Sequence, residues 1–477
     1  MKIKLFTRKK DLDIKSQTSS LKPQASGLNS KASGLNSKAP GQKLKARYDA
    51  AQTTADNARH WAMADSLSAD SANSCDIRRK LISRSRYEVA NNSYAKGIVL
   101  TLANDCIGTG PRLQVLTKDA VFNRKVETAF MDWSRSISLA AKLRTLRMAK
   151  TTDGEGFGVL TVNSAITGAV KLDLALVEAD RITTADYRLA MNNNIDGIEL
   201  DRFGNPARYS VLSSHPGDSG LFVNNYDIVD ADSMVHWFRV DRPGQHRGIP
   251  EITAALPLFA QLRRYTLAVL SAAETAADFA AVLFTDSPAN GEAAGVEPMD
   301  IIELEKRMAT VLPDGWKLGQ IKAEQPATSY AEFKREILNE IARCLNLPYN
   351  IAACNSSGYN YASGRLDHQL YFKAIRVEQM DLATVVLDKI LQAWLNEAML
   401  SSEFSLLRTL SNLPHQWFFD GNEHVDPAKE AKAQQLRLSS NTTTLAYEYG
   451  RQGKDWETEL NQRAKEKQLM TELGLEH

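Results

Sequence analysis

The sequence predicts a mostly helical α+β protein that folds into several regions. Apolar residues recur at helical spacing in long stretches on both sides of residue 250, and short runs typical of strands lie between residues 170 and 240. The chain has 477 residues, of which 43% are hydrophobic, so it is long and apolar enough to bury more than one core. We therefore expect an α/β region followed by long helices.

Residues 1–44 are predicted to be a disordered basic arm. They are rich in Lys, Ser, Gly and Gln and contain a tandem copy of ASGLNSK at 25–31 and 32–38, with too few large apolar residues for a core. The arm either contacts phosphates or is a solvated tail without a partner, and the sequence favours neither.

Residues 45–249 are predicted to form a mixed α/β domain. Val126, Phe130 and Trp133 fall at i, i+4 and i+7, as do Leu139, Leu143 and Leu146, which predicts two amphipathic helices. Strands are predicted where Leu172, Leu174 and Leu176 alternate with other residues, on both sides of the turn at 203–206, and at 234–240.

Residues 250–279 are predicted to form one helix, about 40 Å long at 1.5 Å per residue. Apolar or small residues cover nearly all of its surface, so it needs neighbours on several sides. In a ring these neighbours are copies of the same helix, and in a monomer the helix is the centre of one large core.

Residues 280–327 are predicted to be a compact insertion, with strands at 280–285 and 317–321 and a helix at 299–312. A helix at 328–346 follows, and Ser329 and Glu332 form an S-x-x-E capping box at its start.

Residues 349–364, YNIAACNSSGYNYASG, carry no charged side chain and are predicted to be a loop. Residues 366–424 are predicted to contain a long helix and the segment that follows it. The helix begins near Arg365 and runs to about residue 400. Residues 425–477 are predicted to be helical, with Thr442 and Asp455 as N-caps.

The charge of the chain is nearly balanced. The formal net charge is +1, which disfavours tight static binding of nucleic acid. The four cysteines show no C-x-x-C spacing, so we expect reduced thiols in a cytoplasm. The apolar stretch 249–285 carries Arg263, Arg264, Glu274 and Asp278, so no membrane-spanning segment is expected, and no apolar region typical of a secretory signal follows the basic N-terminus.

Motifs of the common enzymes are missing, so we predict no catalytic residues, no metal site, no cofactor and no enzymatic activity. The sequence has no GxxxxGK[ST] loop, no G-x-S-x-G elbow and no H-E-x-x-H helix. Two carboxylate pairs, Asp153 with Glu155 and Asp420 with Glu423, leave a metal-dependent nuclease or other DNA-processing enzyme as an alternative, and a monomeric scaffold or adaptor as a second one.

Several segments, in chain order, resemble the lambda-type family of bacteriophage portal proteins over nearly everything after residue 45. The resemblance rests on these segments: RYDAA at 47–51, SADS at 68–71, RKLISRSRYEVANNSYAKGIV at 79–99, NDCIGTGPRLQ at 104–114, DGEGF at 153–157, FGNPARY at 203–209, HWFRVDRPGQHRGIP at 236–250, SYAEF at 329–333, NLPY at 346–349, GYNYASGR at 358–365 and VDPAKEAKA at 425–433.

The resemblance implies a portal-type fold that assembles as a ring, typically a dodecamer, around an axial channel at one capsid vertex of the virion. It implies a wing at 45–249, stem helices at 250–279 and 328–346, a clip at 280–327, a tunnel loop at 347–365, a long wing helix with its following segment at 366–424 and a crown at 425–477. The implied partners are double-stranded DNA in transit, the terminase large subunit, head-completion and tail connector proteins, and capsid and scaffold proteins. No membrane partner is expected, and assembly would occur in the host cytoplasm.

Six residues of the predicted loop are the candidate DNA-channel residues: Asn355, Ser356, Ser357, Tyr359, Asn360 and Tyr361. Neutral polar side chains make weak contacts with sugar and phosphate, whereas Lys or Arg holds each phosphate more firmly. The alternative is a buried connector in which the tyrosines pack against neighbouring helices and never meet DNA.

Overall fold

The structure is a computed structural model, and it describes residues 54–184, 194–218, 225–278, 282–285, 316–319, 329–401, 404, 413–421 and 426–475. The predicted arm at 1–44 and the predicted helix at 299–312 lie outside these residues. The chain divides into residues 1–66 and a second unit, residues 67–477. In the first unit Thr54 and Asn57 join by local hydrogen bonds, and the second unit holds all the helices and strands described below.

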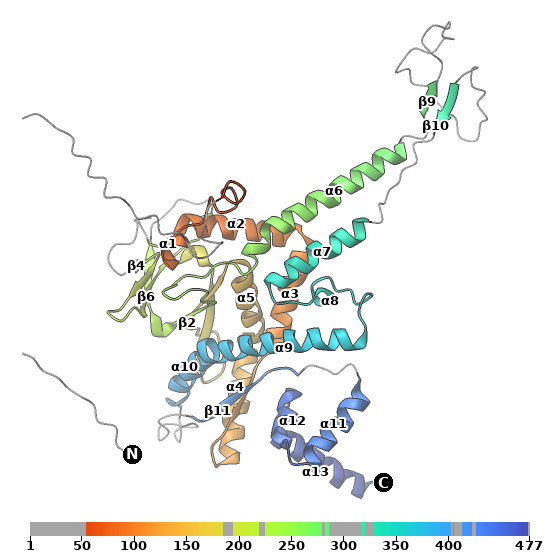
Figure 1. The fold of residues 1–477 in the computed structure, drawn as a ribbon. Helices are drawn as coiled ribbons and strands as arrows, with labels where there is room; N and C mark the ends of the chain where they lie inside the picture. Colours follow the sequence, from red (N-terminus) through yellow and green to blue (C-terminus); the bar gives the residue numbers. More distant parts are fainter. Residues whose placement is uncertain are drawn as a thin grey trace, which may run out of the picture. The chain divides into compact units, whose positions relative to one another are not determined.

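The predicted fold class is confirmed, because the second unit is mostly helical with small antiparallel sheets (Figure 1). Its N-terminal helices are α1 (Ala69–Ala72), α2 (Cys75–Asn91), α3 (Ser93–Ile107), α4 (Ala120–Ser136) and α5 (Leu139–Thr152). Polar caps set two of the starts, since the Asn92 side chain accepts hydrogen bonds at α3 and the Asp119 side chain does so at α4. The two apolar stripes predicted for α4 and α5 are buried, as expected.

Two of the sheets contain the strands predicted between residues 170 and 240, together with strands at 155–162 and 226–230. One has the order β3-β2-β8, and the other has the order β4-β5-β6-β7. Their bounds are β2 (Glu155–Val162), β3 (Leu172–Val177), β8 (Met234–Phe238), β4 (Asn194–Ile195), β5 (Ile198–Leu200), β6 (Pro206–Leu212) and β7 (Tyr226–Asp230). All their pairings are antiparallel, and Phe157 of β2 lies opposite Val177 of β3 and His236 of β8.

The helix predicted at 250–279 begins later than expected. Residues 251–252 form a turn, Thr253–Ala255 form a 3-10 turn, and α6 spans Leu256–Asp278. The reason is tertiary, because the Glu251 amide donates to the Thr151 carbonyl and its carboxylate binds Arg147, which holds this segment outside the helix.

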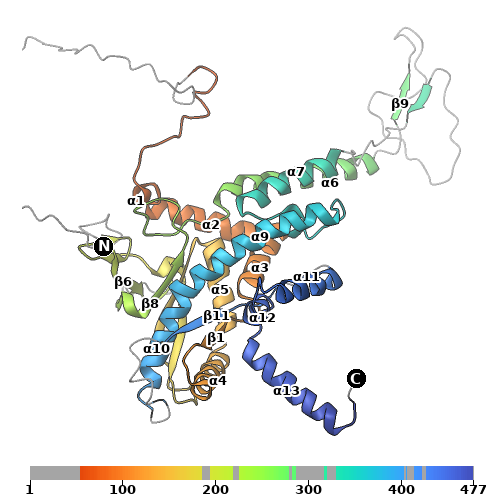
Figure 2. The same cartoon turned by 60° about the horizontal axis from the view of Figure 1, so that its bottom comes forward.

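Helix α7 (Ser329–Cys344) packs beside α6, as Figure 2 shows. Because α7 already begins at Ser329, the predicted cap falls one residue inside the helix. Between α6 and α7 the strands β9 (Val282–Thr285) and β10 (Trp316–Gly319) pair antiparallel, close to the two strands predicted for the insertion.

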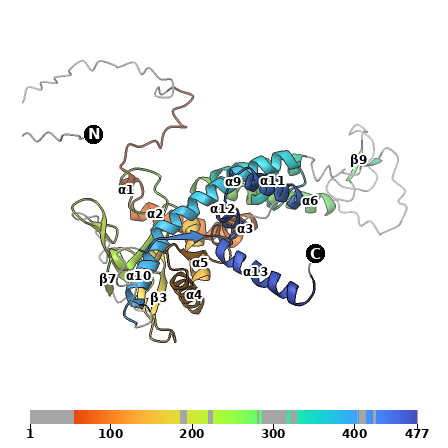
Figure 3. The same ribbon diagram turned by 90° about the horizontal axis from the view of Figure 1, so that it is seen from below.

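Helices α9 (Tyr361–Leu382) and α10 (Asp388–Ala398) follow one line and are joined by a π-helical turn, Ala383–Leu387 (Figure 3). The helix predicted from Arg365 to about 400 is therefore present, and it starts four residues early. Its C-terminal half enters the largest core, where Trp394 contacts the rings of Phe130 and Trp133 from α4.

The C-terminal part of the chain is helical, as predicted. Strand β11 (His415–Phe418) pairs with β1 (Arg112–Val115), and α11 (Pro427–Ser439), α12 (Leu445–Arg451) and α13 (Trp456–Glu472) follow. Asp455 caps α13 as expected, but the cap of α12 is Thr444, because the Thr442 hydroxyl instead binds the carbonyl of Arg437 at the end of α11. Among the described helices, none combines the length and the apolarity needed to cross a bilayer.

Candidate functional site: the loop Ala353–Asn360 and the groove beside it

The uncharged segment is a shorter loop than predicted. Residues Tyr349–Ala352 form the short helix α8 after Pro348, and α9 already begins at Tyr361, so the loop comprises only residues 353–360. The prediction missed the second boundary because Asn360 and Ser363 form a reciprocal capping box, with each side chain accepting from the other's backbone N–H, which starts the helix within the uncharged segment.

The structure brings the six candidate residues together on one short segment, and five of them are exposed. Asn355, Ser356, Ser357, Asn360 and Tyr361 are exposed, and Tyr359 is half-buried. Two side chains bind the local backbone, since Asn355 accepts from the Ser357 amide at 2.9 Å and Asn360 caps α9.

Tyrosines connect the loop to its surroundings. Burial, and after it the carboxylate of Asp367, raises the pKa of Tyr359. The Lys429 ammonium of α11 lies 5.3 Å from the ring centroid of Tyr361. A cation over an aromatic face is attractive, so the start of α9 is linked to the C-terminal helices.

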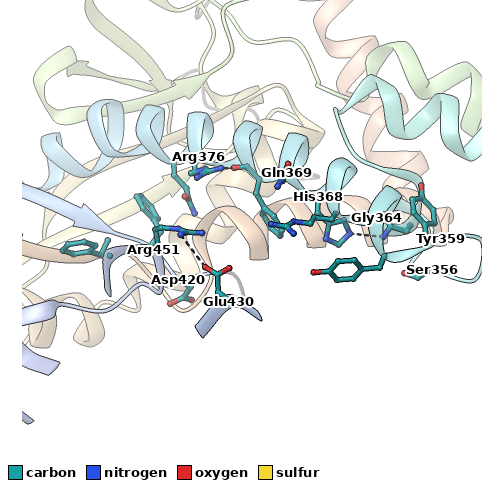
Figure 4. Close-up of a pocket in the computed structure, with 18 of the residues that line it drawn as sticks. Ser356, Tyr359, Gly364, His368, Gln369, Arg376, Asp420, Glu430 and Arg451 are labelled. Atoms are coloured by element: carbon teal, nitrogen blue, oxygen red, sulfur yellow. Dashed lines mark hydrogen bonds and ion pairs between the residues drawn. The ribbon is translucent and has the colours of Figure 1, made fainter. Parts of the chain in front are cut away.

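A groove of about 690 Å³ runs beside this loop (Figure 4). One wall is α9, and the other is the segment Trp417–Gly421 with parts of α11 and α12. The loop contributes Ser356, Tyr359 and Asn360 to it. Sequence reasoning missed this groove, because its two walls come from distant segments and no local pattern indicates that they meet.

The groove has a cationic side and an acidic side. Arg365 and Arg376 of α9 line it, and neither forms an ion pair within the residues that the structure describes. On the other wall Glu430 accepts from Arg437 and lies 3.6 Å from Arg451. Burial of Asp420 would raise its pKa, but hydrogen bonds from Thr109 and Arg112 lower the pKa below its usual value. The carboxylate therefore stays ionised. The acidic groups are therefore neutralised, and the groove keeps an excess of positive charge.

A cluster of buried charges lies where the chain leaves the sheet β3-β2-β8 for α6, and we call it the ionic junction: Arg78, Glu155, Asp196, His236 and Arg247. Arg247 donates to Glu155 at 2.6 Å, His236 lies 3.2 Å from the same carboxylate, and Arg78 pairs with Asp196. Burial alone would raise the pKa of Glu155, but Arg247 and His236 hold it far below its usual range.

A second set of ion pairs links α5 to the start of α6 and to α9. Arg147 donates to Glu251 at 2.8 Å, and Lys150 donates to Glu378 of α9 at 2.7 Å. The Lys150 ammonium also lies 4.5 Å from the ring centroid of Trp237 in β8. Because Arg147, Lys150 and Glu251 are buried, their charges need these partners, and the ion pairs hold the three elements together.

Three of the four carboxylates that suggested a nuclease are bound by arginines in the structure. Asp153 accepts two hydrogen bonds from Arg86 at 2.8 Å, Glu155 belongs to the ionic junction, and Asp420 pairs with Arg112. Glu423 and His424 lie outside the described residues. Within those residues, no group of three or more His, Cys, Asp or Glu side chains is arranged to hold a metal ion. Ion pairs thus explain Asp153, Glu155 and Asp420, the three of these carboxylates that the structure describes.

Comparison with known proteins identifies the family. The family model for the phage portal protein, lambda family, matches residues 55–379. The probable portal protein of Halomonas phage phiHAP-1 is 26% identical over 317 residues, which cover 63% of this chain and 61% of that protein. The matched part thus spans less than two thirds of this relative's length.

Two solved structures with a similar fold are necks of gene transfer agent particles. The neck of the empty particle, computed with C6 symmetry, is 15% identical with a TM-score of 0.48, and the match covers 78% of this chain and 93% of that one. The neck of the native particle, computed with C12 symmetry, is 15% identical with a TM-score of 0.46 and coverage of 76% and 90%. Since the family model spans well over half of the residues, the chain belongs to the lambda family of phage portal proteins.

Proposed function

We propose that this protein is the subunit of a ring, typically of twelve copies, at one vertex of a phage capsid, and that double-stranded DNA enters and leaves through the ring. Membership in the family carries this proposal and supports a location in the virion. The ring would assemble in the host cytoplasm.

An apolar surface on α9 supports assembly with further copies. Leu366, Leu370, Val377 and Met380 follow one another at spacings that keep them on one side of the helix, and each is 63–72% exposed. On the opposite side of α9 the side chain of Tyr371 is buried in the core, so the helix has apolar residues on two sides. A monomer rarely leaves such a stripe in water, and a second copy in a ring would cover it.

The regions of a portal subunit correspond to segments of this chain as follows. We propose a wing at 45–249, stem helices at 250–279 and 328–346, a clip at 280–327, a tunnel loop at 347–365, a long wing helix with its following segment at 366–424 and a crown at 425–477. Within the tunnel-loop region, the parts without helix are residues 347–348 and 353–360. The clip would bind the terminase large subunit and later head-completion and tail connector proteins, and the outer surface would contact capsid and scaffold proteins.

The proposed mechanism is passive. Each phosphate that a protein neutralises adds salt-dependent affinity, and this affinity would slow DNA that has to slide. A loop without charge at the narrowest point limits such contacts, and the energy for packaging would come from the terminase. We therefore propose no enzymatic activity for the ring itself.

The experiment that tests the ring is a mass measurement of the purified full-length chain by sedimentation velocity over a wide range of concentrations and salt. We expect closed assemblies of many copies, and negative-stain images with a central hole. A strictly monomeric protein in all conditions, with metal-dependent DNA cleavage, would instead support the nuclease alternative.

The Ser357→Arg substitution tests the contact between the loop and DNA. The Ser357 side chain is exposed, so we expect unchanged folding and ring assembly, and DNA packaging that falls several-fold because each copy adds about one phosphate contact. Packaging of DNA into proheads at several salt concentrations measures this effect, which should weaken as salt rises.

Ser214→Arg is the matched control, because it adds the same charge on an exposed turn after β6. Asn360→Arg is a poorer probe, since removing the α9 cap would cost about 1 kcal/mol by itself. Normal packaging by Ser357→Arg, or failure of this variant to assemble, would reject the loop as the DNA contact.

A further inference from the structure

Helix α6 has an outward side of small residues with one cation. Ala260, Arg264, Ala268 and Ser271 are exposed, Leu267 is exposed at the edge of this side, and Leu262 faces the core. Residues two apart on a helix point about 160° away from each other, so Arg264 points opposite Leu262. The adjacent Arg263 pairs with Glu88 of α2 at 3.3 Å, but Arg264 has no ion pair within the residues that the structure describes.

Helix α7 has an outward side of three carboxylates. Glu332, Glu336 and Glu340 occur at every fourth residue, and all three are exposed. Leu338 lies two residues from Glu336 and from Glu340, and it is buried. Like charges at this spacing repel one another along a helix. Within the described part of the chain the ion pair recorded for them is Glu336 with its neighbour Arg335 at 3.5 Å, both more than half exposed. Among the described residues, the acidic side therefore has no ion pair with a cation from another element.

The contact between α6 and α7 within one chain uses other residues. The Tyr265 ring lies 5.7 Å from Tyr330 and 4.7 Å from Phe333, measured between ring centroids. Because Tyr265 faces α7, the side of α6 that carries Arg264 and the carboxylate side of α7 are both left uncovered by this contact. A ring needs two such different surfaces on each subunit, since each copy contacts the next in a head-to-tail manner.

The relative heights of the two helices indicate which residues would meet. Rotation about the axis of a closed ring moves a subunit around that axis without shifting it along the axis. Tyr265 contacts Tyr330 and Phe333 in its own chain, so a ring axis that runs along the two helices would place Arg264 level with the first turns of α7 in the next copy. Glu332 and Glu336 lie in these turns.

We infer that α6 of each copy packs against α7 of the next copy, with Arg264 facing Glu332 and Glu336 of that copy. This inference rests on the proposed ring and adds the surfaces that build it. The small side chains of α6 let the helices approach closely, and the single cation selects the acidic side of α7 as partner. Opposite charges arranged in this way also suppress wrong pairings.

A charge exchange tests the inference on the full-length chain. The variants are Arg264→Glu, Glu336→Arg and the two combined, and sedimentation velocity measures the concentration at which half of the chains are assembled. We expect each single substitution to raise this concentration about tenfold at low salt and the combination to restore it to within about threefold of wild type. Arg202→Glu is the control, because it makes the same charge change on an exposed turn between β5 and β6.

A disulfide between copies gives a second measurement. Ala260→Cys and Glu336→Cys, with Cys75→Ser, Cys344→Ser and Cys354→Ser, place one thiol on each of the two outward sides. Under oxidation we expect a ladder of linked chains on a denaturing gel, and neither cysteine alone should produce more than a linked pair.

The outcomes separate this inference from the ring itself. If wild type forms rings and the single substitutions assemble equally well, or the combined variant stays as impaired as the single ones, the pairing of α6 with α7 is wrong and the ring stands. Absence of a ladder from wild-type-like rings leads to the same conclusion. A wild-type chain that never assembles rejects the ring as well.

Discussion

The Glu155→Gln substitution is expected to lower the free energy of unfolding by about 3–5 kcal/mol at neutral pH. The Glu155 carboxylate is completely buried and binds Arg247, His236 and the backbone N–H of Gly248. The neutral side chain of Gln would leave the buried positive charge without a counter-charge. Chemical denaturation of the two proteins measures the difference. Glu457→Gln, on the exposed side of α13, makes the same change in water and should alter stability by less than about 0.5 kcal/mol.

The dependence of this effect on pH follows from the lowered pKa of Glu155. A carboxyl group whose pKa is lower in the folded state stabilises the fold above its unfolded pKa of about 4.3, and this stabilisation is lost as the pH falls towards the folded value. The difference between wild type and Glu155→Gln should thus be constant from pH 6 to 8 and shrink below about pH 4. An equal difference at pH 3 and pH 7 would mean that the carboxylate charge is not the cause.

The Gly248→Ala substitution is expected to lower the free energy of unfolding by about 3 kcal/mol or more, or to prevent folding, because the added Cβ would clash with the backbone of another segment. A Cβ at Gly248 would lie 2.1 Å from the carbonyl oxygen of Gly154 and 2.9 Å from the Cβ of Glu155. No change of side-chain rotamer relieves such a contact. Soluble yield and chemical denaturation measure the effect.

Gly358→Ala is the control for this prediction, since no atom lies within 4 Å of the Cβ that it would add. We expect its stability to match wild type within about 0.5 kcal/mol. A Gly248→Ala protein as stable as this control would show that the two segments do not cross as closely as in the structure.

The periodic parts of the fold could be predicted from the sequence, and the contacts between distant segments could not. The stripe of Val126, Phe130 and Trp133 repeats within two turns, so it indicates both the helix and its buried side. The segments 153–157 and 246–250 contributed to the family resemblance, but nothing in either one indicates that Gly154 and Gly248 touch. Arg247 is almost fully buried, although arginine in a loop is normally expected in water.

For the candidate site, the uncharged loop could be predicted from the sequence, and the groove beside it could not. The absence of charge between residues 349 and 364 was visible in the sequence and led to the six candidate residues. The early start of α9 also had a local signal, the polar pair Asn360 and Ser363, which an analysis focused on Ser/Thr-x-x-Glu caps overlooks. The groove had no such signal, because Trp417 and Arg376 come together only through the folding of the whole unit.

The π-helical turn between α9 and α10 has a consequence for how this long helix can change during evolution. A π turn closes with an i→i+5 hydrogen bond, so it holds one residue more than an α-helical turn. In an unbroken α-helix, which turns by about 100° per residue, Tyr371 and Trp394 would point about 140° apart. Both side chains are buried, so the π turn brings the buried sides of the two halves back into phase. Loss of its one surplus residue should leave these sides aligned, whereas loss of one residue elsewhere in the helix should turn one half by about 100° relative to the other.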